Sequence, residues 1–190
     1  MFIAQRTNNM RIIVFISFCL FLLSSCVVIG LTNDYGKLNR ERRQLINPLV
    51  NFDKTKPGNI YIVNAAQIKE NIINYPKAIV YVFSVGCSHH EDVPLSVFEN
   101  FAERNKFRLY LVLTGYSELE KVLDQEINSP LYSIDNKYYK TRLRHLYERY
   151  FTNELTGKPL KAKYSEREHF GSIYFFENGQ LVKVLNELPE

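Results

Sequence analysis

The sequence predicts an α/β domain in which helices flank a mixed β-sheet. From about residue 59 onward, apolar strand-like runs alternate with stretches whose apolar residues recur at helical spacing. Near the C-terminus, Asn178-Gly179 separates two further strand-like runs, and this dipeptide favours a type I′ hairpin turn. Strands that alternate with helices, followed by a hairpin, give a mixed sheet covered by helices.

The first strand and helix are expected within residues 59–76. Residues 60–63 form a short apolar run that reads as a strand. Asn64 is a candidate N-cap with Gln67 at position N3, and apolar residues then repeat at helical spacing. Pro76 ends this helix.

The second strand and helix are expected on either side of Cys87. Residues 78–83 are continuously apolar and rich in β-branched side chains, the pattern of a strand buried on both faces. After Cys87, residues 88–91 read Ser-His-His-Glu, which is the pattern of a capping box. The apolar face of the helix that follows is formed by Leu95, Phe98, Phe101 and Ala102.

The second half of the domain predicts a strand, two helices and the hairpin. Residues 107–114 read as a strand, and a second capping box at 117–120 opens a helix to about Gln125. A longer helix is expected over residues 136–151, with Tyr139, Leu143, Leu146, Tyr147 and Tyr150 on its apolar face. The hairpin strands are expected at residues 172–176 and 180–185.

The N-terminus has the pattern of a secretion signal. Arg6 and Arg11 precede an uninterrupted run of apolar or small residues at 12–23. The run ends in Leu-Ser-Ser-Cys at residues 23–26, which resembles the lipobox of bacterial lipoproteins. That resemblance implies cleavage before Cys26 and attachment of acyl chains such as palmitate to it.

Domain boundaries follow from this signal. We expect a signal peptide at residues 1–25, a lipidated tether at 26–58 and a folded domain at 59–190. An uncleaved signal anchor is the alternative, because residues 12–31 contain no charge and are about long enough to span a bilayer. Either arrangement places the folded domain outside the cytoplasm and holds it at a membrane.

The three cysteines have different expected fates. Cys19 leaves with the signal peptide and Cys26 is acylated, so Cys87 is the one thiol expected in the mature chain. An unpaired cysteine in an oxidising compartment is a candidate reactive thiol or mixed-disulfide partner. The alternative is a buried, chemically inert cysteine.

The residues around Cys87 favour a reactive thiol. A thiolate at a helix N-terminus is stabilised by unpaired backbone N–H groups and by the helix dipole. His90 is three residues further on, about one helical turn, and is the expected partner of the thiolate. His89 points elsewhere on such a helix and is expected to face solvent.

Charge and motifs exclude several other functions. The chain has a formal net charge of +4, and losing residues 1–25 removes Arg6 and Arg11, which leaves +2. This charge is too small to indicate a nucleic-acid partner. The sequence contains no phosphate-binding loop, no Gly-x-Ser-x-Gly elbow and no His-Glu-x-x-His pair.

The order of elements and two local motifs resemble the thioredoxin family over about residues 59–186. The first motif is the strand–cysteine–helix junction at Cys87, the place of the family's nucleophilic cysteine. The second is the segment 170–182, which resembles the closing hairpin of the family. With the lipobox, the chain is similar to envelope thioredoxin-like lipoproteins related to cytochrome-maturation thioredoxins. The resemblance implies a thioredoxin-like sheet with a helical insertion before the C-terminal hairpin.

The sequence departs from the family pattern at four places. His90 stands where the resolving cysteine would be, so an intramolecular disulfide cannot form. Gly171 occupies the place of the family's cis-proline. Pro94 comes seven residues after Cys87, one fewer than the family's helix-kinking proline, and little chain remains after Leu185 for a terminal helix.

The expected function is that of a monothiol thioredoxin-like protein of the bacterial cell envelope, facing the periplasm or the exterior. Cys87 and His90 are the expected catalytic residues, and the resemblance implies that Phe170 and Gly171 contact substrate. The expected partners are the membrane, through Cys26, and envelope proteins joined by a mixed disulfide. No cofactor is expected.

Two alternatives remain open at the level of sequence. The first is a redox-inactive binding module whose basic helix, with Lys137, Lys140, Arg142, Arg144 and Arg149 beside its apolar stripe, contacts a membrane or partner. The second is copper or zinc binding by Cys87, His90 and His169.

Overall fold

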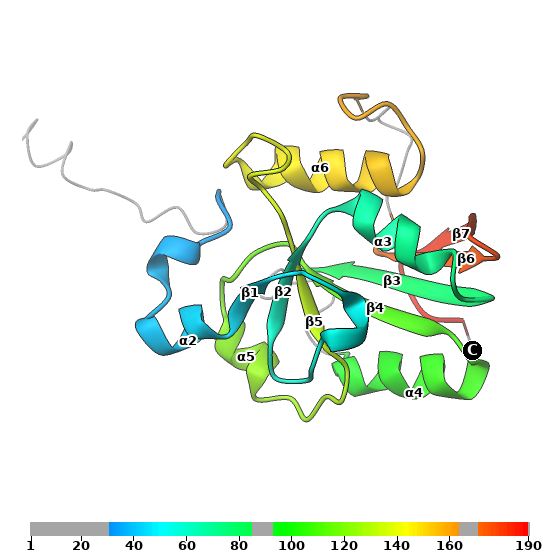
Figure 1. Ribbon diagram of the computed structural model, residues 1–190, viewed down its shortest axis with the longest axis horizontal. Helices are drawn as coiled ribbons and strands as arrows, with labels where there is room; N and C mark the ends of the chain where they lie inside the picture. The colour runs from blue at the N-terminus through cyan, green and yellow to red at the C-terminus, as the bar shows by residue number, and fades with distance from the viewer. Residues whose placement is uncertain (1–30, 85–92, 164–170, 190) are drawn as a thin grey trace, which may run out of the picture.

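A computed structural model describes residues 31–84, 93–163 and 171–189 as an α/β fold (Figure 1). Its sheet has seven strands in the order β1-β2-β5-β4-β3-β6-β7. Neighbouring strands from β1 to β3 in this order are parallel, whereas β6 pairs antiparallel with β3 and β7. The expectation of a mixed sheet flanked by helices is confirmed. The strands are β1 (Ile46–Pro48), β2 (Ile60–Val63), β3 (Lys77–Phe83), β4 (Arg108–Leu113), β5 (Leu131–Ile134), β6 (Ile173–Glu177) and β7 (Gln180–Leu185).

Helices cover both faces of the sheet and enclose two apolar cores. Helices α3 (Ala65–Ile72) and α6 (Arg144–Leu155) pack on one face, and α4 (Leu95–Asn105) and α5 (Leu119–Leu123) pack on the other (Figure 1). Among the described residues, none of these helices has the length and apolar character of a bilayer span. The remaining elements are short: η1 (Tyr35–Lys37), α2 (Arg40–Gln44) and η2 (Phe52–Lys54).

The start of α3 confirms the expected N-cap. The Asn64 side chain accepts a hydrogen bond from the Gln67 backbone N–H (2.9 Å), and the Gln67 side chain accepts one from the Asn64 N–H (3.0 Å). This reciprocal pair satisfies two of the backbone donors that a helix start leaves unpaired. Ile68 and Ile72 are then buried one turn apart against the sheet.

Strand β3 lies in the interior of the sheet and separates the two cores. Its register pairs it with β4 on one side and with β6 on the other. Because side chains alternate along a strand, Val80 enters the core under α3, whereas Ile79 and Tyr81 enter the core over α4. The expected strand buried on both faces is therefore confirmed.

The C-terminal hairpin is also confirmed. Strands β6 and β7 pair across a turn in which Asn178 and Gly179 both have positive φ values, 48° and 79°. Two successive positive φ values are those of a type I′ turn, which matches the twist of the flanking strands. Residues 186–189 contain no helix, as the short chain after Leu185 predicts.

Two strands were not expected, and one lies before the expected start of the domain at Asn59. Strand β1 joins the sheet because Ile60 N–H donates to Leu45 O (2.8 Å) and Leu49 N–H donates to Ile62 O (3.3 Å). Phe52 is likewise buried in the core under α3. Strand β5 is too short to show a period of its own, and it is inserted between β2 and β4.

The helix expected over residues 136–151 was wrong in its position. Helix α6 begins at Arg144 and ends at Leu155. The preceding stretch forms turns instead. Asp135 Oδ1 accepts hydrogen bonds from the backbone N–H groups of Lys137 and Tyr138, and Lys140 has a left-handed backbone conformation with φ 54°. Tyr147 is buried as expected, whereas Leu143 precedes the helix and is exposed.

The capping box expected at Ser117 was also wrong. Helix α5 is present, but its N-cap residue is Glu118, which is left-handed (φ 54°) and makes no side-chain cap. The Ser117 hydroxyl instead donates a 2.6 Å hydrogen bond to Asp34 Oδ2, 83 residues earlier in the chain. A tertiary contact therefore replaces the local one.

Gly171 is required by close packing of two backbones. A Cβ atom at this position would lie 2.3 Å from Leu185 O and 2.6 Å from Leu185 C, far inside van der Waals contact. The described residues contain no cis peptide bond. The absence of a side chain at Gly171 therefore allows the end of β7 to lie against the start of β6.

We predict that Gly171→Ala lowers the free energy of unfolding by roughly 2 kcal/mol or more, because the backbone of Leu185 must move to admit the methyl group. Urea unfolding of the two proteins measures this difference. Gly36→Ala is the matched control, since nothing lies within 4 Å of its Cβ position, and it should change stability by less than about 0.5 kcal/mol. Equal stability of Gly171→Ala and the wild type would contradict the packing account.

Candidate functional site

The carboxyl ends of β4 and β5 form a topological switch point. After β4 the chain crosses to the face covered by α4 and α5, and after β5 it crosses to the face covered by α3 and α6. In open α/β sheets, ligands bind in the crevice that opens where adjacent connections leave on opposite faces. A ligand-binding site is therefore expected at this edge of the sheet.

Strand β3, which precedes Cys87 in the sequence, ends at the same edge. Phe83 O accepts a hydrogen bond from Thr114 N–H (2.9 Å), and Val82 N–H donates to Ser172 O (2.8 Å). The end of β3 is thus held from both neighbouring strands. Ser84 is the last described residue before Cys87 in the sequence.

Most of the expected site residues lie outside the described residues. These are Cys26, Cys87, His90, His169 and Phe170, together with the capping box expected at 88–91. After that segment the chain is described again from Val93, and α4 begins at Leu95 with Pro94 as its N-cap residue. The described start of α4 therefore lies eight residues after Cys87 in the sequence.

The N-terminal segment 31–36 lies in the crevice at the switch point. Asn33 O accepts a hydrogen bond from Tyr116 N–H, and Leu31 O accepts one from Arg144 N–H, both at 2.9 Å. The Asn33 side chain also donates to Asn136 Oδ1 (3.4 Å). The segment is therefore attached to the chain after β4, to the chain after β5 and to the start of α6.

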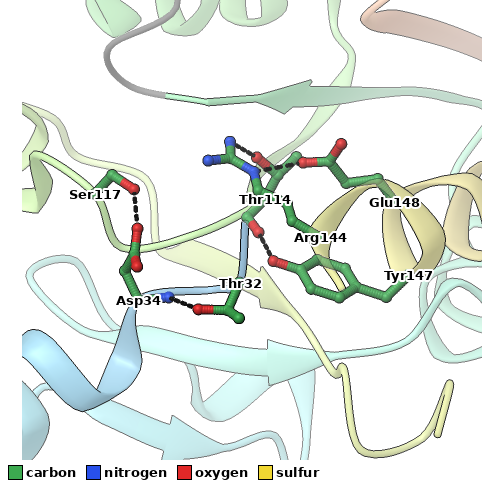
Figure 2. Close-up of polar contacts among 7 residues, drawn as sticks. All are labelled: Thr32, Asp34, Thr114, Ser117, Arg144, Tyr147 and Glu148. Atoms are coloured by element: carbon green, nitrogen blue, oxygen red, sulfur yellow. Dashed lines mark hydrogen bonds and ion pairs between the residues drawn. The ribbon is translucent and has the colours of Figure 1, made fainter. Parts of the chain in front are cut away.

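A buried carboxylate, Asp34, fixes this segment in place. Asp34 is only 5% exposed, and its Oδ2 accepts a hydrogen bond from the Ser117 hydroxyl (Figure 2). Its Oδ1 pairs with Lys37 Nζ at 2.9 Å. Its backbone N–H donates to the Thr32 hydroxyl (3.4 Å). A carboxylate is stable at such a position because charged and neutral donors replace its water.

A second buried polar group, centred on Arg144, lies beside the first. Arg144 is 9% exposed, its Nε donates to Glu148 Oε1 (2.7 Å), and a terminal N–H group donates to the Thr114 hydroxyl (Figure 2). The Tyr147 hydroxyl donates to Thr114 O. Burial raises the pKa of Tyr147 above its ordinary value, so this hydroxyl stays a donor. Together these contacts join the start of α6 to the end of β4.

A pocket of about 440 Å³ opens next to segment 31–36. Tyr35 and Tyr116 form one wall, with ring centroids 5.9 Å apart and an edge-to-face arrangement. Burial raises the pKa of Tyr116 to about 12 against an opposing hydrogen bond with Ser133. The other lining residues combine apolar side chains with amides and charges: Ile46, Ile62, Ile134, Asp135, Asn136, Lys137 and Arg142.

The described residues leave the metal alternative untested and change the shape of the expected basic surface. Within 31–84, 93–163 and 171–189, no group of three or more His, Cys, Asp or Glu side chains could hold a metal ion, and the set Cys87, His90 and His169 is not described. The expected basic helix is divided, because Lys137 precedes α6 and Arg144 is buried.

Sequence reasoning missed Asp34, Thr114 and Tyr116. Asp34 is about 80 residues from the other two, so only the fold brings it to the chain that follows β4. One local feature could have indicated the site. Residues 114–117, Thr-Gly-Tyr-Ser, follow a buried strand, and residues at that position lie at the carboxyl edge of a parallel sheet, where ligands bind.

No family model, no curated protein and no solved structure matches this chain. Its function is therefore inferred from its own residues and their geometry.

We predict that Arg144→Met lowers the free energy of unfolding by roughly 2 kcal/mol, because Thr114 and Glu148 lose a buried charged donor. Urea unfolding again provides the measurement. Arg142→Met is the control, because Arg142 is exposed and should tolerate the change within about 0.5 kcal/mol. Similar losses in the two variants would contradict a structural role for the buried contacts.

Stability should also fall at alkaline pH. The pKa of Tyr116 is about 12 in the folded chain, above the ordinary value near 10, so the unfolded chain loses this proton first. The stabilising contribution is complete below pH 10 and is lost as the pH rises toward 12. In Tyr116→Phe, the fall in unfolding free energy between pH 9 and pH 11 should be smaller by about 1 kcal/mol. An identical fall in both proteins would contradict the prediction.

Proposed function

We propose that the chain is a membrane-anchored, thioredoxin-like protein of the bacterial cell envelope that presents one thiol, Cys87, for thiol–disulfide exchange. The observation that supports this proposal most directly is the position of β3. The carboxyl end of β3 is held by Thr114 and Ser172 from both sides, and the chain continues from it to Cys87. A chain segment that starts from a strand end fixed in this way can hold a reactive group in a defined place.

The order of elements is consistent with the thioredoxin-like part of the proposal. The succession β2, α3, β3, α4 and β4 alternates strand and helix, with α3 and α4 on opposite faces, and the β6–β7 hairpin closes the sheet. Strand β5 and helix α6 are additions between β4 and the hairpin. Helix α6 lies where the resemblance implies a helical insertion, whereas β5 is not part of that expectation.

The proposed reaction is a thiolate exchange. The Cys87 thiolate attacks one sulfur of a partner's disulfide, a new S–S bond forms, and the second sulfur of the partner leaves as a thiolate. Because residue 90 is His rather than Cys, a thiolate from another molecule must attack the mixed disulfide. His90 would stabilise the ionised sulfur. No cofactor is needed for these steps.

The membrane part of the proposal depends on Cys26. Acylation at this residue would hold the domain at a membrane, facing the periplasm or the exterior. The anchor would also increase the local concentration of Cys87 near membrane proteins, which favours exchange with such partners.

A second candidate function is supported by Gly171 and by the pocket. Gly171 packs against the backbone of Leu185, which explains this residue without a substrate contact. The pocket beside Tyr116 is built from residues that perform no thiol chemistry. These observations favour a redox-inactive binding or scaffold lipoprotein, in which Cys87 has no chemical role.

Trapping in intact cells tests the exchange reaction. We expect the wild-type chain to form higher-mass adducts that a reducing agent releases, and Cys87→Ser to form none. Cys19→Ser is the matched control, because that cysteine lies within the expected signal peptide, and it should form the same adducts as the wild type. Adducts that persist in Cys87→Ser would contradict the proposed function.

Partner retention separates the two candidate functions. After amine-directed crosslinking in cells, mass spectrometry compares the proteins bound to the wild type and to Cys87→Ala. Loss of the partners in Cys87→Ala supports exchange through a mixed disulfide. Retention of the same partners supports a binding module instead.

A further inference from the structure

Exposed apolar and basic side chains surround the N-terminal segment 31–36. Leu31, Tyr35 and Leu143 are large apolar residues that are 49%, 39% and 38% exposed. Leu31 and Leu143 are neighbours because Arg144 N–H donates to Leu31 O. Tyr35 lies in the pocket wall with Lys137 and Arg142. We call Leu31, Tyr35, Lys137, Arg142 and Leu143 the anchor-side face.

The basic side chains of the anchor-side face outnumber the acidic ones beside them. Among the described residues, neither Lys137 nor Arg142 has an ion-pair partner within 4 Å. Asp135 lines the same pocket and offsets one of these two charges, whereas Asp34 and Glu148 pair with other cations. Asp34 contacts Ser117 and Lys37, Asp135 Oδ1 accepts two backbone N–H groups, and Glu148 accepts from Arg144.

Two more cations adjoin this face. Arg43 lies over the ring of Tyr35, with its guanidinium carbon 5.5 Å from the centroid, and it donates to Gly36 O. Lys37 remains 51% exposed although it pairs with Asp34. The surroundings of Tyr35 are therefore positively charged.

The distance to the expected lipid is short. Leu31 is five residues after Cys26, a span of at most about 18 Å when fully extended. From Leu31 onward the chain is fixed by hydrogen bonds to Arg144, Tyr116 and Ser117 rather than free. A lipid on Cys26 would consequently hold this particular face of the domain near the membrane.

We propose that the anchor-side face lies on the anionic headgroups of the membrane that holds Cys26, so that the carboxyl edge of the sheet is turned toward the bilayer. This orientation rests on the proposed acylation of Cys26. Leu31, Tyr35 and Leu143 enter the interfacial region, and Lys137 and Arg142 bind lipid phosphates. Partners that reach the carboxyl edge are then proteins embedded in or attached to the same membrane.

Amine footprinting of the full acylated chain tests this orientation. The chain is reconstituted into vesicles of phosphatidylcholine alone or with phosphatidylglycerol, treated with a water-soluble amine-reactive reagent, and analysed by mass spectrometry. The anionic lipid should slow modification of Lys37 and Lys137 by roughly threefold or more, and salt should reduce the effect. Lys77 and Lys106 are internal controls, because they lie at the opposite edge of the sheet, at the start of β3 and the end of α4.

Charge reversal supplies a second measurement with a matched control. The double variant Lys137→Glu/Arg142→Glu should lose the protection of Lys37. The control Lys161→Glu/Lys163→Glu makes the same change in net charge beyond the other end of α6, at exposed residues, and should keep the protection.

Each outcome has a definite meaning. An N-terminal peptide without acyl chains would overturn the anchor and the proposed orientation together. An acylated chain whose four lysines react at the same rate in both vesicles would overturn the orientation alone. Protection in cells but not in anionic vesicles would assign the face to an envelope protein and overturn the lipid contact.

Discussion

The burial of β3 between β4 and β6 is the constraint on which the rest of the fold depends. This strand has a neighbour on each side and contributes side chains to both cores, so α3 and α4 are positioned on opposite faces of it. Its carboxyl end is fixed by Thr114 and Ser172. The segment that contains Cys87 therefore follows a strand end that is hydrogen-bonded on both sides.

The N-terminal segment 31–36 is part of the folded domain although it lies before the expected start of the domain at Asn59. The contacts that stabilise the buried carboxylate of Asp34 include Ser117 and Lys37, and detaching the segment would break them. Strand β1 and Phe52 extend this attachment across the sheet. Segment 31–36 would thus determine which side of the domain faces the proposed anchor.

The parts of the fold that the sequence predicts are those set by local interactions. The Asn64 cap, the burial of residues 78–83 and the Asn178-Gly179 turn each need only a few neighbouring residues, and all three were predicted correctly. The errors occur where distant contacts prevail. Ser117 pairs with Asp34 instead of capping α5, and turns around Asp135 displace the start of α6. The site at the carboxyl edge could not be predicted, because β5 had to be placed between β2 and β4 first.

The central claim is that Cys87 is a reactive thiol, and the pKa of its sulfur tests this claim most directly. In the proposed mature chain Cys87 would be the one remaining thiol, so the rate of its alkylation by iodoacetamide can be followed against pH for the folded and the urea-unfolded protein. The account predicts a folded-state pKa clearly below the free-thiol value of about 8.5. A folded-state pKa at or above that of the unfolded chain would contradict it.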